Sequence, residues 1–162
     1  MIDTGLLAEA FERNTWIIRA QTEGLDHAAC LIQTPYRINC LNWTLGHILD
    51  GRGRLLEMAG AEPVLSGDET SRYRRESDPV LEDGPGVLPL QRLLQALDET
   101  QARMSAALGA LDEAAFSEET DVGDGRMMSL AARLHFGYFH DTYHTGQTEL
   151  LRQVTGVGDK VI

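Results

Sequence analysis

The sequence has few cysteines, no long apolar run and few basic residues, and each shortage excludes a class of protein. Its two cysteines, Cys30 and Cys40, show no C-x-x-C spacing and follow no secretory leader, so we interpret both as small buried apolar side chains in the reducing cytoplasm. No apolar segment approaches the roughly 20 residues that a membrane-spanning helix needs. These shortages predict a soluble cytoplasmic protein.

Basic residues are scarce relative to acidic ones. The chain has 14 Lys and Arg against 25 Asp and Glu, which gives a formal net charge of −11 at pH 7 with His neutral. Nucleic acids and anionic membranes are bound through cationic side chains, so this balance argues against both as partners. The longest basic run, Arg72-Tyr73-Arg74-Arg75, lies among acidic residues, and we interpret it as part of a solvated loop.

The alternation typical of β-strands is nearly absent, whereas four segments repeat apolar residues at helical spacing. The predicted helices cover about Thr4–Glu23, Asn39–Ala59, Val87–Leu111 and Ser129–Val154. Asn39 or Asn42 is the predicted cap of the second helix, and Ser129 that of the fourth. At 162 residues, the chain has the length of one domain with its own core. The sequence therefore predicts an all-α protein, one domain over residues 1–162, folded as an antiparallel four-helix bundle.

Three features interrupt this regular pattern. Residues Ala61–Gly86 are polar and show no helical period, so we expect a long loop that either covers a site or is disordered. The second helix contains Gly46, Gly51 and Gly53, each costing about 1 kcal/mol of helix propensity relative to Ala. Either close helix packing or room for a bound group accounts for them. In the third helix, Gln101 interrupts the apolar stripe.

The predicted fourth helix carries polar residues on the face expected to point into the bundle. It contains the segment His140-Asp141-Thr142-Tyr143-His144-Thr145-Gly146-Gln147. Residues four apart lie one above the other on a helix, so the imidazoles of His140 and His144 can converge on one metal ion. Gln147 falls on the same face, where it either orients a ligand or is a hydrogen-bonded interior amide.

A catalytic metal site usually has three protein ligands and one open position for water or substrate. The expected third ligand is His47, which borders the apolar stripe of the second helix; a hydrogen-bonded core histidine is the alternative. Asp50 lies three residues further on. Its carboxylate can hold a histidine N–H, act as a base, ligate the metal, or pair with Arg54.

Two short motifs together resemble those of a known family. Trp43-x-x-Gly46-His47 in the second helix and His140-Asp141-x-Tyr143-His144-x-Gly146-Gln147 in the last are similar to the motifs of the DinB-like, or DinB/YfiT-type, damage-inducible proteins. In that family, one histidine from the second helix and two from the last bind a divalent metal, commonly zinc or nickel, inside a four-helix bundle. The resemblance implies such an ion at His47, His140 and His144.

Related members of the family use the metal to activate a low-molecular-weight thiol, such as bacillithiol or mycothiol, for transfer or isomerisation. We therefore expect a metal-dependent enzyme acting on a small molecule, either a small-thiol-dependent S-transferase or a hydrolase, with Asp50 and Gln147 as candidate catalytic residues. The alternative is a non-catalytic bundle that binds a partner, in which the metal or hydrogen bonds between histidines hold two helices together. Whether the chain forms a homodimer stays open.

Overall fold

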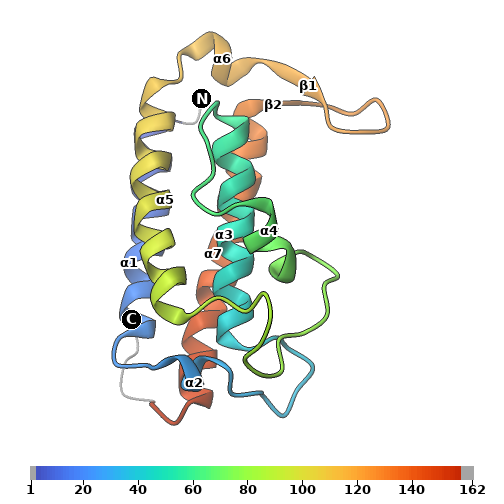
Figure 1. The fold of residues 1–162 in the computed structure, drawn as a ribbon. Coiled ribbons are helices and arrows are strands. Elements are labelled where there is room, and N and C mark those ends of the chain that lie inside the picture. The colour runs from blue at the N-terminus through green and yellow to red at the C-terminus, as the bar shows by residue number, and fades with distance from the viewer. Residues whose placement is uncertain (1–2, 158–162) are drawn as a thin grey trace.

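Figure 1 shows the computed structural model of the protein, which describes residues 3–157; both ends of the predicted domain, residues 1–2 and 158–162, lie outside this range. The described chain is mostly helical, as the sequence predicts. Its long helices are α1 (Thr4–Thr22), α3 (Leu41–Met58), α5 (Leu90–Ala110) and α7 (Leu130–Val154). Helix α1 packs against α5 and α7, and α3 packs against the same two helices. All four helices predicted from apolar periodicity and terminal residues are thus present in the described chain.

Short elements connect the long helices. They are α2 (His27–Cys30), α4 (Gly67–Thr70), the 3₁₀ turn η1 (Ser71–Tyr73), α6 (Glu113–Ser117), β1 (Glu119–Asp121) and β2 (Met127–Ser129). Strands β1 and β2 form an antiparallel hairpin, in which Glu119 pairs with Ser129 and Asp121 with Met127. The sequence analysis did not predict this hairpin, because strands of three residues are too short to show an alternating pattern.

Capping interactions explain one helix start and correct another. The Ser129 side chain accepts a hydrogen bond from the first turn of α7 (3.2 Å), which confirms the predicted cap. The predicted asparagine cap of α3 was wrong, because the N-cap residue is Cys40 and makes no side-chain cap bond. Asn42 instead donates to the Leu88 carbonyl oxygen (2.9 Å) and accepts from the Tyr73 hydroxyl (3.2 Å). The Asn42 side chain, which the local sequence pattern assigned to capping, therefore makes tertiary hydrogen bonds instead.

The segment Ala61–Gly86, predicted to be a loop without regular structure, contains α4 and η1 and packs onto α3. A capping box between Ser66 and Glu69 starts α4. Tyr73, at the end of η1, is fully buried, and its hydroxyl also accepts a hydrogen bond from the Leu88 backbone N–H (2.6 Å). The basic run around Tyr73 is therefore not simply a solvated loop, because its aromatic member anchors the segment.

Gly46 allows the close approach of Tyr73 to α3. A Cβ atom at position 46 would lie 2.2 Å from the Tyr73 ring, far inside van der Waals contact. On α7, a Cβ atom at Gly137 would lie 2.4 Å from the Leu55 side chain of α3. At Gly53, by contrast, a Cβ atom would meet only the Pro63 side chain, at an ordinary 3.5 Å. Close packing thus explains Gly46 and does not explain Gly53.

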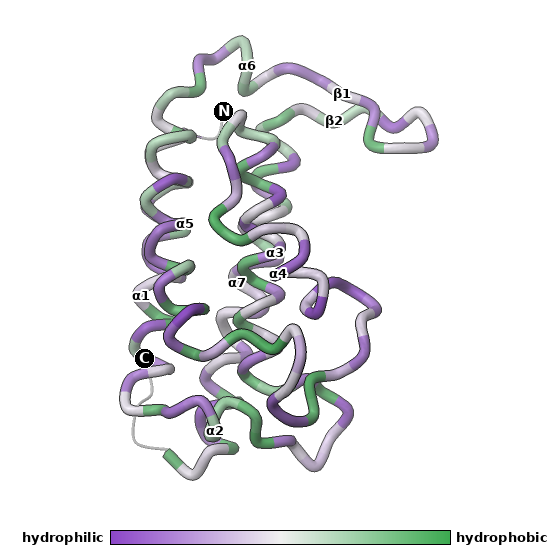
Figure 2. Tube along the Cα trace, in the orientation of Figure 1, coloured by the Kyte–Doolittle hydropathy of each residue, from purple (hydrophilic) through white to green (hydrophobic). Residues whose placement is uncertain are grey.

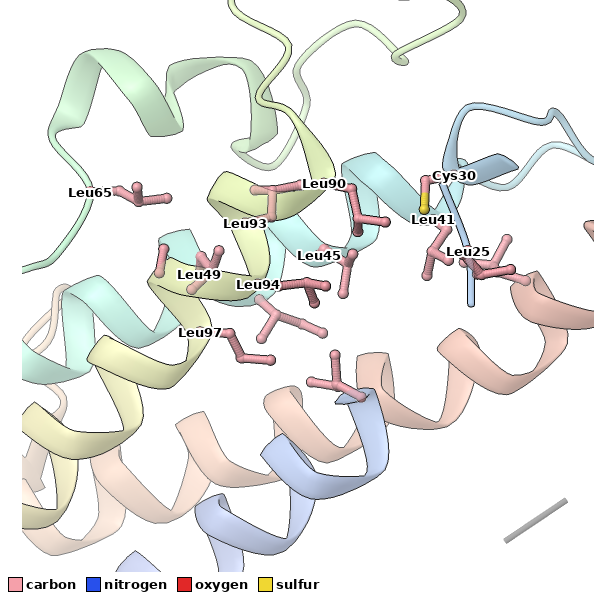
Figure 3. Packing of buried hydrophobic residues seen from close by; sticks show 14 residues of the cluster. Leu25, Cys30, Leu41, Leu45, Leu49, Leu65, Leu90, Leu93, Leu94 and Leu97 are labelled. Atoms are coloured by element: carbon pink, nitrogen blue, oxygen red, sulfur yellow. The ribbon is translucent and has the colours of Figure 1, made fainter. Parts of the chain in front are cut away.

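Buried apolar side chains fill the space between the long helices. One cluster lies toward the α2 end and is formed mainly by leucines of α3 and α5 (Figure 3). A second lies toward the α6 end and includes Phe11 and Met104. Along α5, hydrophilic and hydrophobic residues alternate at short intervals (Figure 2), as an amphipathic helix requires. Both cysteines are buried and free of disulfides, which agrees with their predicted role in packing.

Among residues 3–157, every helix is too short or too polar to cross a membrane.

Replacing Gly46 with Ala should destabilise the protein by about 1–3 kcal/mol, because the added methyl group forces the buried Tyr73 ring to move. The matched control is Gly53→Ala, which meets no close neighbour and should raise the free energy of unfolding by up to about 1 kcal/mol through helix propensity. Urea denaturation followed by circular dichroism measures both. Equal effects of the two substitutions would contradict this account of Gly46.

Candidate metal centre

The structure brings all three predicted histidines together between α3 and α7. Nε2 of His140 lies 3.3 Å from Nε2 of His47 and 3.2 Å from Nε2 of His144. One ligand nitrogen from each ring lies within 4.8 Å of the other two. Four-coordinate zinc, with metal–nitrogen distances of about 2.0–2.1 Å, requires its ligand nitrogens to be about 3.3 Å apart. Two of the three pairs have this spacing and the third is at most 4.8 Å apart, so the described residues contain a three-histidine group that could hold one divalent ion.

Hydrogen bonds behind the cluster fix the orientation of two of the rings. Nδ1 of His47 donates to the Tyr73 carbonyl oxygen (2.7 Å), and Nδ1 of His144 donates to Gln147 Oε1 (2.8 Å). Because both oxygens can only accept, each Nδ1 carries the ring hydrogen and each Nε2 presents a lone pair to the cluster. The Trp43 ring stacks on His47 with centroids 4.6 Å apart and 15° between the planes. Gln147 thus lies on the predicted face of α7, where its hydrogen bond orients the His144 ring.

Burial lowers the pKa of all three imidazoles. For His140 the pKa falls to about 4, first through burial and then through the neighbouring rings of His144 and His47. The pKa of His47 is lowered by burial, against a smaller upward effect of its hydrogen bond to Tyr73. Burial likewise lowers the pKa of His144. All three rings are therefore neutral at pH 7, which is the form that binds a metal.

A cavity of about 620 Å³ opens beside the three histidines. Its lining includes Trp43 from α3, Tyr143 and Gln147 from α7, and Arg37 from the segment before α3. All three histidines line this cavity, so a small molecule bound in it would lie beside the candidate metal site.

Asp50 is not part of this group. Its carboxylate is buried and lies 2.8 Å from the Arg54 guanidinium and 3.8 Å from that of Arg74. It lines a separate cavity that none of the three histidines borders. Of the roles weighed for Asp50, pairing with Arg54 is thus the one present in the structure, and its catalytic role stays a prediction.

A buried ion pair next to the histidines was not predicted from the sequence. Arg52 of α3 and Asp141 of α7 form two hydrogen bonds, Nε–Oδ2 at 2.7 Å and Nη2–Oδ1 at 3.1 Å, and both side chains are almost inaccessible. Asn14 of α1 also donates to Asp141 Oδ1 (2.7 Å), and Arg52 donates to Thr15 of α1 (2.7 Å) and to Gln101 of α5 (3.4 Å). One polar network therefore connects all four long helices.

Two features of the sequence could have located this network. Gln101 interrupts an apolar stripe, and a buried amide needs hydrogen-bonding partners. Asp141 directly follows His140 in a helix whose neighbouring positions are expected to be buried. The hydrogen bond that Tyr73 accepts from His47 left no such signal in the sequence, because its acceptor is a backbone carbonyl group of a connecting segment.

Comparisons with known proteins agree on the fold. The family model of the DinB superfamily matches residues 10–148, a range that includes all three histidines. A crystal structure of a conserved protein from Enterococcus faecalis aligns with a TM-score of 0.74 and 18% sequence identity, covering 96% of this chain and 98% of that chain. At this identity the likeness concerns the fold alone. No match is found among curated proteins.

The substitution Asp141→Asn should lower the free energy of unfolding by about 3–5 kcal/mol, because it leaves the buried Arg52 guanidinium without its counter-charge. The matched control is Asp98→Asn, which breaks an exposed ion pair with Arg19 and should cost less than about 1 kcal/mol. Chemical denaturation of both variants tests the difference. A loss no greater than that of the control would show that the network contributes little to stability.

Metal-free protein should lose stability as the pH falls from 7 to 5. Histidines of the unfolded chain take up protons near pH 6.5, whereas His140 in the folded chain does so only near pH 4, so acid favours unfolding. The substitution His140→Gln should reduce this decline, by at most about 2 kcal/mol. His135→Gln, at an exposed position of the same helix, is the control and should leave the decline unchanged. Denaturation midpoints at both pH values provide the measurement.

Proposed function

The chain belongs to the DinB superfamily, and we propose that His47, His140 and His144 bind one divalent metal ion, zinc or nickel, at the centre of a metal-dependent enzyme. In this proposal the four long helices form the antiparallel bundle expected from the sequence, and the ion is held between α3 and α7. The enzyme acts on a small molecule and transfers or activates a small thiol, with water activation and hydrolysis as the second candidate reaction.

The proton positions in the cluster carry the proposal. Nδ1 of His47 and Nδ1 of His144 both donate to oxygen atoms, so in each ring Nε2 is unprotonated and carries a lone pair. Nε2 of His140 is within 3.3 Å of each, but it can supply at most one hydrogen. Hydrogen bonding between the histidines therefore leaves one short contact unsatisfied. A cation bound at the centre, with His140 protonated at Nδ1, satisfies all three nitrogens.

The set of ligands supports a catalytic rather than a purely structural ion. Three neutral imidazoles leave the full divalent charge on the ion, which supplies a Lewis acid able to lower the pKa of a bound water to about 7 or to hold a thiolate. With three protein ligands, a tetrahedral ion would keep one position for an exchangeable ligand, and the cavity that the three histidines line would adjoin that position.

The protein's own cysteines are poor nucleophiles, which favours an external thiol. Burial raises the pKa of the Cys30 thiol to about 12 and also raises that of Cys40. Both therefore remain protonated at neutral pH, whereas the thiolate is the reactive form. We propose that the thiol of the reaction is brought by a small substrate that enters the cavity beside Gln147.

The two candidate catalytic residues have different roles in this proposal. Gln147 holds Nδ1 of His144 and lines the cavity, so it positions both a metal ligand and the substrate. The Asp50 carboxylate, which Arg54 partly neutralises, adds negative charge near His47 that favours a cation bound there. It acts at a distance, through the electrostatic potential.

Purified protein without a histidine tag should bind one zinc or nickel ion per chain, and His144→Ala should weaken that affinity by more than the 10–100-fold typical of losing an outer hydrogen bond. His135→Ala, on the exposed side of α7, is the control and should bind metal as the wild type does. Competition with a chromogenic chelator measures all three affinities. A wild-type protein that takes up no divalent ion would refute the site.

Metal-loaded protein should accelerate the transfer of a small thiol to an electrophile, and His144→Ala should abolish the acceleration while far-ultraviolet circular dichroism remains that of the wild type. The helices persist because leucine clusters away from the histidines supply the core. If removing the metal instead abolishes most of the helicity, the ion is a structural staple and the enzyme proposal fails.

A further inference from the structure

A second cavity, of about 670 Å³, also borders His140. It lies between α3, α7 and the β1–β2 hairpin, and five arginines contribute to its lining: Arg52, Arg54, Arg75, Arg126 and Arg133. The chain as a whole has a net charge of −11 and only 14 basic residues. More than a third of its basic residues therefore surround one cavity next to the histidines, a concentration that the composition does not predict.

Internal ion pairs account for only part of this positive charge. Arg52 is neutralised by Asp141, and Arg54 pairs with Asp50. Arg133 donates to the neutral hydroxyl of Thr120 (2.9 Å).

The remaining two arginines reach the cavity from exposed segments. Arg75 lies 3.8 Å from Glu76 where both are largely exposed, so that this pair is weak. Arg126 is exposed at the end of the hairpin turn. Against these and Arg133, the cavity lining adds one further acid, Asp121. An excess of guanidinium groups thus remains to bind an anion.

The rest of the lining is apolar. Leu55 and Met58 of α3, Met128 of β2 and Phe136 of α7 contribute to the wall, and the Phe136 side chain is 63% exposed. Gly51 adds no side chain next to His140, where a Cβ atom would meet the imidazole only at an ordinary 3.7 Å. Packing therefore does not require a glycine at position 51. Because Gly51 has no side chain, it leaves room in the cavity.

We propose that this cavity binds the anionic end and the apolar body of an organic substrate, with a carboxylate or phosphate held by Arg126 and Arg133. Planar guanidinium groups bind both kinds of oxyanion through paired hydrogen bonds. Since His140 borders both cavities, the bound substrate lies next to the three-histidine group. The inference rests on the proposed function for the reaction that follows, but binding of the anion requires only the arginines and the apolar wall, and no metal ion.

Calorimetric titration of the full chain with 4-phenylbutyrate, 2-phenylethyl phosphate and the neutral 4-phenylbutanol tests the inference, in metal-free and in zinc-loaded protein. One or both anions should bind at least 10-fold more tightly than the alcohol, and more weakly as salt is added. A stronger response to one anion identifies the head group. Equal binding of the alcohol and both anions would overturn the inference.

Variants then locate the binding site. The double substitution Arg126→Gln/Arg133→Gln should weaken anion binding at least 10-fold, and Arg126→Glu, at an exposed position that cannot unfold the core, should do so alone. Arg13→Gln, at an exposed position of α1 outside the cavity, is the matched control and should change the affinity less than twofold. Anion binding that survives both cavity variants would overturn the proposal.

The failure of this inference is distinguishable from failure of the metal site. The arginine variants should bind zinc within twofold of the wild type, and metal-free His144→Ala should still bind the anion. Zinc binding without anion binding would overturn the cavity proposal and leave the metal proposal intact. Anion binding in a protein that takes up no metal would support the cavity and refute the proposed reaction.

Discussion

The buried ion pair between Arg52 and Asp141 is the constraint on which the site depends. A charged group removed from water is strongly destabilising unless its partner is in place, so α3 and α7 must pack in the register that joins the two. Asp141 directly follows His140, and Arg52 lies little more than one helical turn after His47. The register that neutralises the pair therefore also brings His47 opposite His140 and His144. Stability of the fold and assembly of the site require the same alignment.

The motif Trp43-x-x-Gly46-His47 has a physical reason at each of its named positions. Trp43 stacks on the His47 ring, and Gly46 leaves the space in which the Tyr73 ring lies against α3. With Tyr73 seated there, its backbone carbonyl oxygen accepts the hydrogen bond that orients His47. The segment between α3 and α5 thus covers this part of the site, and the glycine makes that covering possible.

Two cavities of different character meet at His140. The one beside Gln147 is lined by all three histidines, whereas the one beneath the hairpin combines arginines with apolar side chains. A net charge of −11 does not prevent an anion from binding in the second cavity. At physiological ionic strength, interactions between exposed charges are largely screened beyond about 8 Å, so the nearest guanidinium groups determine the local potential.

The sequence by itself determined the features that depend on local periodicity. Apolar spacing located the four long helices, and the separation of four residues between His140 and His144 placed both on one face of α7. The sequence could not determine contacts between segments that are distant along the chain. The ion pair of Arg52 with Asp141, the carbonyl group of Tyr73 behind His47 and the arginines around the second cavity each join residues that are far apart in the chain. Asn42 shows the same limit, since its local pattern allows a helix cap and the packed chain uses it to hold Leu88. Tertiary structure decided these features, because a polar side chain takes the partner that burial brings to it, and the sequence order alone does not specify that partner.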